Sequence, residues 1–251
     1  MQDGPTFLTS TDLGVVTTLK TESFGKIGRT YDGRNFTYVG FGGTTPFTAG
    51  MLIVAATTPA NSTGLALAAA QPFVYSLLAG SVSINIVNGA TPVTQDQFAE
   101  GSLDILGTNG LYTYKIRGNS AAAAGATITV YLSEPLRNIL PLAVGVNTFN
   151  LGLSLYSGVI ASTTPAAYVG YVVTPVPQTA AQSFYGWVHI RGRGFGINDA
   201  AAILTKGTTV QQSTTVAGAV VIVSGVASQQ AGVVKETTAV SIGVPLYVNI
   251  Y

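Results

Sequence analysis

The segment from Tyr185 to Gly196 gathers the residue types best able to do chemistry. It contains His189, the single histidine among 251 residues. An imidazole can serve as a general base or a metal ligand, but either role requires a nucleophile, a carboxylate or further ligands close to it. The sequence has no cysteine, and no serine-elbow, zinc-helix, Walker or calcium-loop motif occurs in it. We therefore assign no catalytic, metal-binding or cofactor-binding residue, and we expect a protein that is not an enzyme and uses no cofactor.

A glycine-rich motif, Gly-Arg-Gly-Phe-Gly, occupies positions 192–196. A loop of this kind at the end of a strand can bind phosphate through its backbone N–H groups. The spacing, however, differs from a dinucleotide fingerprint, and the lysine and serine of a phosphate-binding P-loop do not follow. The motif instead predicts a turn or a bulge, because glycine adopts positive φ angles without strain.

The histidine lies in a segment whose composition is typical of a β-strand, and alternate residues of a strand point to the same face of a sheet. In this arrangement Val188 and Ile190 face the core, and the opposite face carries a polar and aromatic ridge. Tryptophan, tyrosine and arginine are common anchors of protein interfaces, so we interpret the ridge as a candidate contact surface. The alternative is aromatic packing between neighbouring strands on a half-exposed sheet face. The candidate interface residues are Tyr185, Trp187, His189, Arg191 and Arg193.

Strand-like segments occur along most of the chain and are separated by turn residues. Residues 81–87 alternate between polar and apolar types as far as Ile86 and are followed by Asn-Gly, a strong hairpin signal. Residues 111–117, 126–132 and 246–251 are similarly rich in β-branched and aromatic types. The alanine-rich stretches give little indication of helix. The sequence therefore predicts an all-β fold of antiparallel sandwich or barrel type, with many short strands.

The predicted domain organisation is an all-β body preceded by a shorter N-terminal segment. Residues 1–30 mix both charge signs with glycine and proline, and we interpret them as an N-terminal arm or as early strands. Residues 31–251 form the body, with a candidate division near residues 162–177. That stretch holds three prolines, which cannot donate hydrogen bonds to the neighbours of a central strand.

Charged side chains are scarce, at 8% of the residues against about 25% in ordinary globular proteins. Residues 35–95 and 207–234 carry none, and the formal net charge is +1. Without a broad basic field, we expect no binding to nucleic acid. The apolar stretches are interrupted before about 18 residues, so we expect no membrane-spanning helix and no membrane partner. A chain this poor in charge is suited to an assembly in which other subunits cover much of its surface.

Three short motifs resemble a known group of proteins. They are Gly-Arg-Asn-Phe-Thr-Tyr-Val at 33–39, Tyr-Thr-Tyr-Lys-Ile-Arg-Gly-Asn at 112–119 and Tyr-Gly-Trp-Val at 185–188. Their order is similar to that in virion structural proteins of tailed bacteriophages, and head decoration proteins are the members that they resemble most. The resemblance spans roughly residues 25–251. It implies a β protein that sits on an icosahedral head and stabilises it against internal pressure, without catalytic residues.

The resulting hypothesis is a non-enzymatic decoration protein that is made in the host cytoplasm and binds the outer surface of the phage capsid in the virion. Its expected partners are the major capsid protein and further copies of itself, as a homotrimer or another small homo-oligomer. One alternative is another virion structural subunit, such as a capsid shell, tail-tube or fibre-base protein. The other is a carbohydrate-binding β-sandwich module, because exposed tyrosine and tryptophan side chains can stack on sugars.

Overall fold

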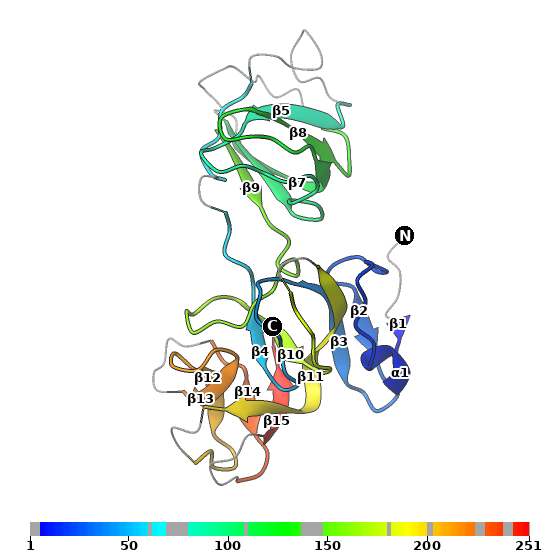
Figure 1. Cartoon of the computed structure of the whole chain (residues 1–251), viewed down its shortest axis with the longest axis vertical. Helices are drawn as coiled ribbons and strands as arrows, with labels where there is room; N and C mark the ends of the chain where they lie inside the picture. The colour runs from blue at the N-terminus through cyan, green and yellow to red at the C-terminus, as the bar shows by residue number, and fades with distance from the viewer. Residues whose placement is uncertain are drawn as a thin grey trace. The chain divides into compact units, whose positions relative to one another are not determined.

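The computed structural model is built almost entirely of β-strands, which confirms the all-β prediction (Figure 1). Its helix, α1 (Ser10–Leu13), is a single turn. The structure describes residues 6–59, 62–68, 80–107, 110–136, 148–179, 182–199, 203–223, 229–237 and 243–250.

The chain divides into two compact units, and the division differs from the predicted one. Unit 1 comprises residues 1–56 and 155–251, and unit 2 comprises residues 57–154, inserted between two strands of unit 1. The stretch 162–177 is not a joint, because it contains β10 (Tyr168–Val172). This strand pairs with β4 (Leu52–Val54) on one side and with β11 (Phe184–Asn198) on the other, so it belongs to the sheet of unit 1.

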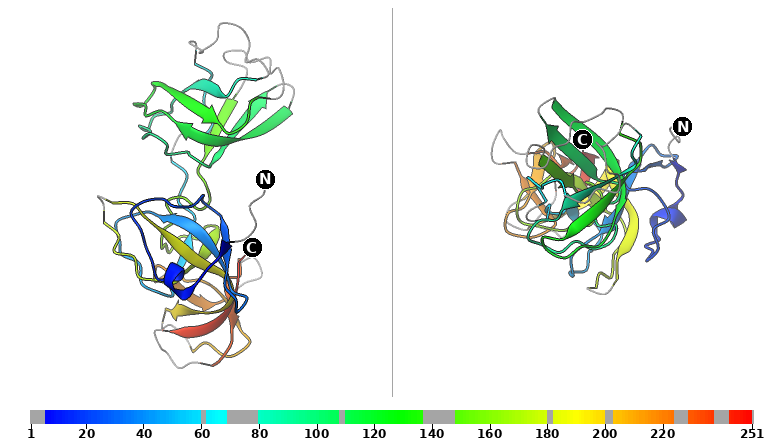
Figure 2. Two further views of the ribbon diagram at one scale, coloured as in Figure 1. Left: turned by 90° about the vertical axis from the view of Figure 1, so that its right-hand side faces the viewer. Right: turned by 90° about the horizontal axis from the view of Figure 1, so that it is seen from above.

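Unit 2 is a barrel of antiparallel strands, whose curl is visible in Figure 2. The segment that contains Leu65 and Leu67 lies between its two outermost strands. Leu65 bridges to Phe149 on one of these strands and Leu67 bridges to Ile86 on the other, which closes the sheet on itself. Closure removes open strand edges, which would otherwise invite pairing with other chains. In spatial order the strands are β5 (Ser83–Val87), β8 (Thr127–Leu132), β7 (Gly110–Asn119), β6 (Ser102–Gly107) and β9 (Thr148–Gly152).

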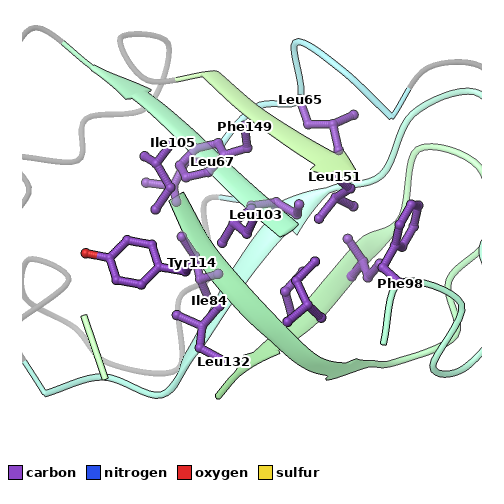
Figure 3. Close-up of a cluster of buried hydrophobic side chains, with 14 of the residues drawn as sticks. Leu65, Leu67, Ile84, Phe98, Leu103, Ile105, Tyr114, Leu132, Phe149 and Leu151 are labelled. Carbon is purple, nitrogen blue, oxygen red and sulfur yellow. The ribbon is translucent and has the colours of Figure 1, made fainter. Parts of the chain in front are cut away.

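The core of unit 2 follows directly from the alternating sequence pattern. Ile84 and Ile86, two of the apolar residues of the alternating stretch 81–87, are fully buried, whereas Val82, which precedes β5, is exposed. Phe98, Leu103 and Phe149 belong to the same core cluster, and Figure 3 shows them around Ile84. Because neighbouring residues of a strand point to opposite faces, one face of each strand packs inside while the other faces solvent.

Unit 1 contains a ten-stranded sheet organised around β11, which at 15 residues is its longest strand. The first half of β11 pairs with β3 and β10, and the second half pairs with β15 and β13. The sheet curls until β15 returns to β11 (Figure 1). The remaining strands are β1 (Thr6–Phe7), β2 (Ile27–Arg29), β3 (Asn35–Phe41), β12 (Thr209–Gln212), β13 (Ala219–Ile222), β14 (Gly232–Val234) and β15 (Val244–Asn249).

The N-terminal segment forms early strands and is not an extended arm over its described part, residues 6–30. Leu8 and Leu13 are buried against Phe36 of β3, and Trp187 of β11 packs on the same cluster. A capping box fixes the start of α1, because the Thr9 side chain accepts from the N–H of Asp12 and the Asp12 carboxylate accepts from the N–H of Thr9. Apolar burial and this cap hold the segment on its own sheet.

Candidate interaction surface on strand β11

All five predicted interface residues lie on β11, which confirms the predicted strand, but the fold places them in two environments. Both faces of the first half of the strand are covered by the protein itself. Val188 is buried in a core cluster on one side, and Trp187 packs against the N-terminal segment on the other. The second half of the strand exposes alternate side chains, among them Arg191 and Arg193.

Tyr185 and Trp187 pack against aromatic rings of the same chain. Tyr185 stacks on Phe24 with 6.1 Å between ring centroids. Trp187 lies directly opposite Tyr38 in the ladder and meets it edge-on, with centroids 5.3 Å apart. This is the cross-strand aromatic packing that the sequence left as the alternative, and the N-terminal segment covers part of the face, so that Tyr185 and Trp187 are partly buried.

His189 is buried, with 5% of its surface exposed. Its ring lies 5.1 Å from that of Phe36, and its Nε2 is 2.8 Å from the backbone oxygen of Arg191. A carbonyl oxygen can only accept, so Nε2 carries the proton and donates. Burial lowers the pKa of His189 to about 4, and the bond to Arg191 offsets part of this effect. The imidazole is therefore neutral and is not placed to contact a partner.

The glycine-rich motif is part of β11 and does not form a turn. The ladder between β11 and β3 changes register between His189 and Arg191, so the bulge lies before the motif and not within it as predicted, and residues 192–196 pair in regular register with β15. Gly192 has φ +110°, a conformation that favours glycine. A Cβ on Gly194 would lie 2.5 Å from Nδ1 of His189, so the absence of a side chain there makes room for the buried ring.

We expect Gly194→Ala to destabilise unit 1 by about 1–3 kcal/mol, because the new methyl group forces the buried imidazole of His189 to move. Urea unfolding followed by fluorescence would measure this cost. Gly243→Ala is the matched control, since a Cβ there meets no atom within 4 Å. The same Gly194→Ala change should cost clearly less in a His189→Ala background; an equal cost in both backgrounds would contradict the steric explanation.

Beyond the bulge, β11 and its neighbours present a continuous exposed surface. One cross-strand row joins Arg29, Asn35, Arg191 and Asn249, each directly opposite the next. A second row passes from Arg193 through β15 to β14. Direct partners in a ladder share a face of the sheet. We call this surface the outer face and define it by its exposed members: Arg29, Arg191, Arg193, Phe195, Val233 and Tyr247.

The outer face is partly apolar as well as basic. Phe195 is 50% exposed, Tyr247 is 49% exposed and Val233 is 39% exposed. Four of its six members were not assigned from the sequence, because they come from β2, β14 and β15 or from the glycine-rich motif. The alternation of residues 246–251 indicates that Tyr247 and its neighbours point to opposite faces. It does not reveal which strand lies beside them.

The chemistry available to this surface is binding by charge and by apolar contact. Within the described ranges, no group of three or more histidine, cysteine, aspartate or glutamate side chains is arranged to hold a metal ion. The part of the chain that the structure covers has no helix long and apolar enough to cross a membrane. The chain matches no protein-family model, no curated protein and no solved structure. Its function must therefore be argued from its own residues.

Proposed function

We propose that the protein is a non-enzymatic virion structural protein that binds the outer surface of a tailed-phage capsid and stabilises the lattice. The observation that carries the proposal is the outer face of unit 1, where arginine and aromatic side chains stand exposed together. Such residues are enriched at the centres of protein interfaces. The resemblance of residues 112–119 and 185–188 to head decoration proteins directs the proposal to a capsid.

The fold suits a protein that must keep a rigid binding surface while it stabilises a capsid lattice. Each unit has its own buried core, and β11 runs through the sheet of unit 1 with both faces of its first half packed. A rigid binding surface loses little conformational entropy on docking. Repetition over a lattice then lets modest contacts add up, especially if the protein binds as a homotrimer or another small homo-oligomer. The proposed partners are the major capsid protein and other copies of this chain.

Co-sedimentation of the purified protein with undecorated heads of the encoding virus tests the proposal. Saturable binding at a fixed ratio to the major shell protein is the expected result, and decorated heads should withstand heating better than bare heads. Absence of binding, with the protein still present in intact virions, would instead favour a shell, tail-tube or fibre-base position. Absence from virions would contradict the proposal and favour the carbohydrate-binding alternative, which a glycan array would then examine.

A further inference from the structure

Three arginines of the outer face form no ion pair with another described side chain, unlike Arg34 in the same unit. Arg34 pairs with Asp32, with 2.8 Å between Nε and Oδ2. The guanidinium groups of Arg29, Arg191 and Arg193, by contrast, have neither an ion pair nor a side-chain hydrogen bond within the residues that the structure describes. Arg191 and Arg193 are two residues apart on one face of a strand, a separation of about 7 Å. Two positive charges are thus held close together with no carboxylate between them.

The strand positions beside these arginines supply apolar surface, and the carboxylate of Asp32, in the turn between β2 and β3, is already paired with Arg34. Tyr247 lies directly opposite Arg193, and Val233 lies directly opposite Tyr247, on strands that run side by side in Figure 1. Phe195 follows Arg193 on the same face and rests on the backbone of Gly50, where a Cβ would be 3.0 Å from its ring. The strand positions of this face carry no aspartate or glutamate.

We infer, building on the proposed function, that the outer face docks on an acidic and partly apolar patch of the capsid shell protein. The planar guanidinium groups of Arg191 and Arg193 can bind carboxylates through two parallel hydrogen bonds each. Phe195 and Tyr247 bury apolar area against the same patch. The three arginines, which have no side-chain partner among the described residues, gain partners in the complex, and this charge complementarity specifies the site.

A nucleic acid fits this face less well than an acidic protein surface does. Affinity for nucleic acid depends on the number of phosphates neutralised, and three arginines can neutralise only about three. The exposed side chains of Phe195, Val233 and Tyr247 would also remain partly uncovered on a phosphate backbone. A protein surface can satisfy both the charges and the apolar side chains.

The test is binding of the full chain to undecorated heads, comparing the wild type with the double variant Arg191→Glu, Arg193→Glu. We expect the double variant to bind at least about 30-fold more weakly, because attraction to carboxylates becomes repulsion. Lys115→Glu with Arg117→Glu is the matched control. These two cations are also exposed and two residues apart on a strand, β7 of unit 2, so the change in net charge is identical. The control should bind within about threefold of the wild type.

Two further measurements make the result specific. Arg191→Gln with Arg193→Gln removes the charges without reversing them, and it replaces the glutamate variant if that protein fails the folding check by circular dichroism. Wild-type binding should weaken as salt is raised, whereas binding of the glutamine variant should depend less on salt. A single-stranded DNA oligonucleotide serves as the alternative polyanion, and we expect no measurable binding to it.

Each outcome separates the inference from the function on which it rests. If the wild type binds heads and the β11 and β7 variants bind equally well, the decoration role stands and the outer face is not its contact surface. If the wild type does not bind heads, the proposed function fails and the inference fails with it. If the oligonucleotide binds and the β11 substitutions abolish that binding, the face recognises a phosphate polymer and the inference is overturned.

Discussion

Phe149→Ala should unfold unit 2 at a much lower denaturant concentration than the wild type while leaving unit 1 folded. The Phe149 side chain is fully buried, and its backbone forms the bridge to Leu65 that helps close the barrel. Truncating a buried phenylalanine costs about 3–5 kcal/mol, which is a large part of the roughly 5–15 kcal/mol that stabilises a typical domain. Unit 2 has its own core, so we expect the loss to stay within that unit.

The position of the single tryptophan makes this prediction measurable. Trp187 lies in unit 1, so its fluorescence reports the unfolding of unit 1, whereas far-ultraviolet circular dichroism reports both units. Phe149→Ala should split the urea transition, with part of the dichroism lost early and the fluorescence transition unchanged. Phe36→Ala is the matched control, because Phe36 is 1% exposed and packs in the cluster beside Trp187. It should move the fluorescence transition instead.

A single coincident transition that shifts for both probes in Phe149→Ala would contradict this expectation. It would mean that the two units unfold as one cooperative system, despite their separate cores. The loss of stability would then belong to the whole chain, and the two structural units would not be independent units of unfolding.

The local pattern of the sequence was sufficient to predict some of the strands, β5, β7, β8 and β15 among them, and part of the core. Alternation in residues 81–87 correctly implies that Ile84 and Ile86 point inward, because the side-chain period of a strand is two, but Val82, which has the same phase, lies before β5 and is exposed. The same reasoning places Tyr185 and Trp187 on the face opposite Val188. It could not reveal that this face is covered as well, since the covering residues lie more than 150 positions earlier in the chain.

The candidate surface was predicted only in part, for a related reason. A bulge between His189 and Arg191 separates a packed half of β11 from an exposed half, and a one-residue change in register reverses which side chains face outward. Arg191 and Arg193 were assigned from their own segment. Arg29 and Tyr247 were missed, because strand pairing across the sheet depends on long-range packing that no local pattern encodes.

Acidification from pH 7 to pH 5 should lower the free energy of unfolding of unit 1 by about 2 kcal/mol through His189 alone. Burial holds the pKa of His189 at about 4 in the folded protein, against 6.5 for an exposed imidazole. Arg34 also disfavours the charged form, and Asp32 partly offsets this. Between these two pKa values the unfolded chain binds a proton that the folded chain does not, so stability falls as the pH falls.

The measurement is urea unfolding followed by Trp187 fluorescence at several pH values, for the wild type and for His189→Gln. Glutamine can still donate to the backbone oxygen of Arg191 but does not titrate, so its stability should change little over this range. The carboxylates of Asp12 and Asp32 do not interfere, because hydrogen bonds from Thr9 and Thr30 keep their pKa values below the usual value for aspartate. Parallel pH profiles for the two proteins would contradict this expectation, because they would show that His189 binds its proton over the same pH range in the folded and the unfolded protein. The ring would then have to reach water, which the packing against Phe36 and Gly194 does not permit.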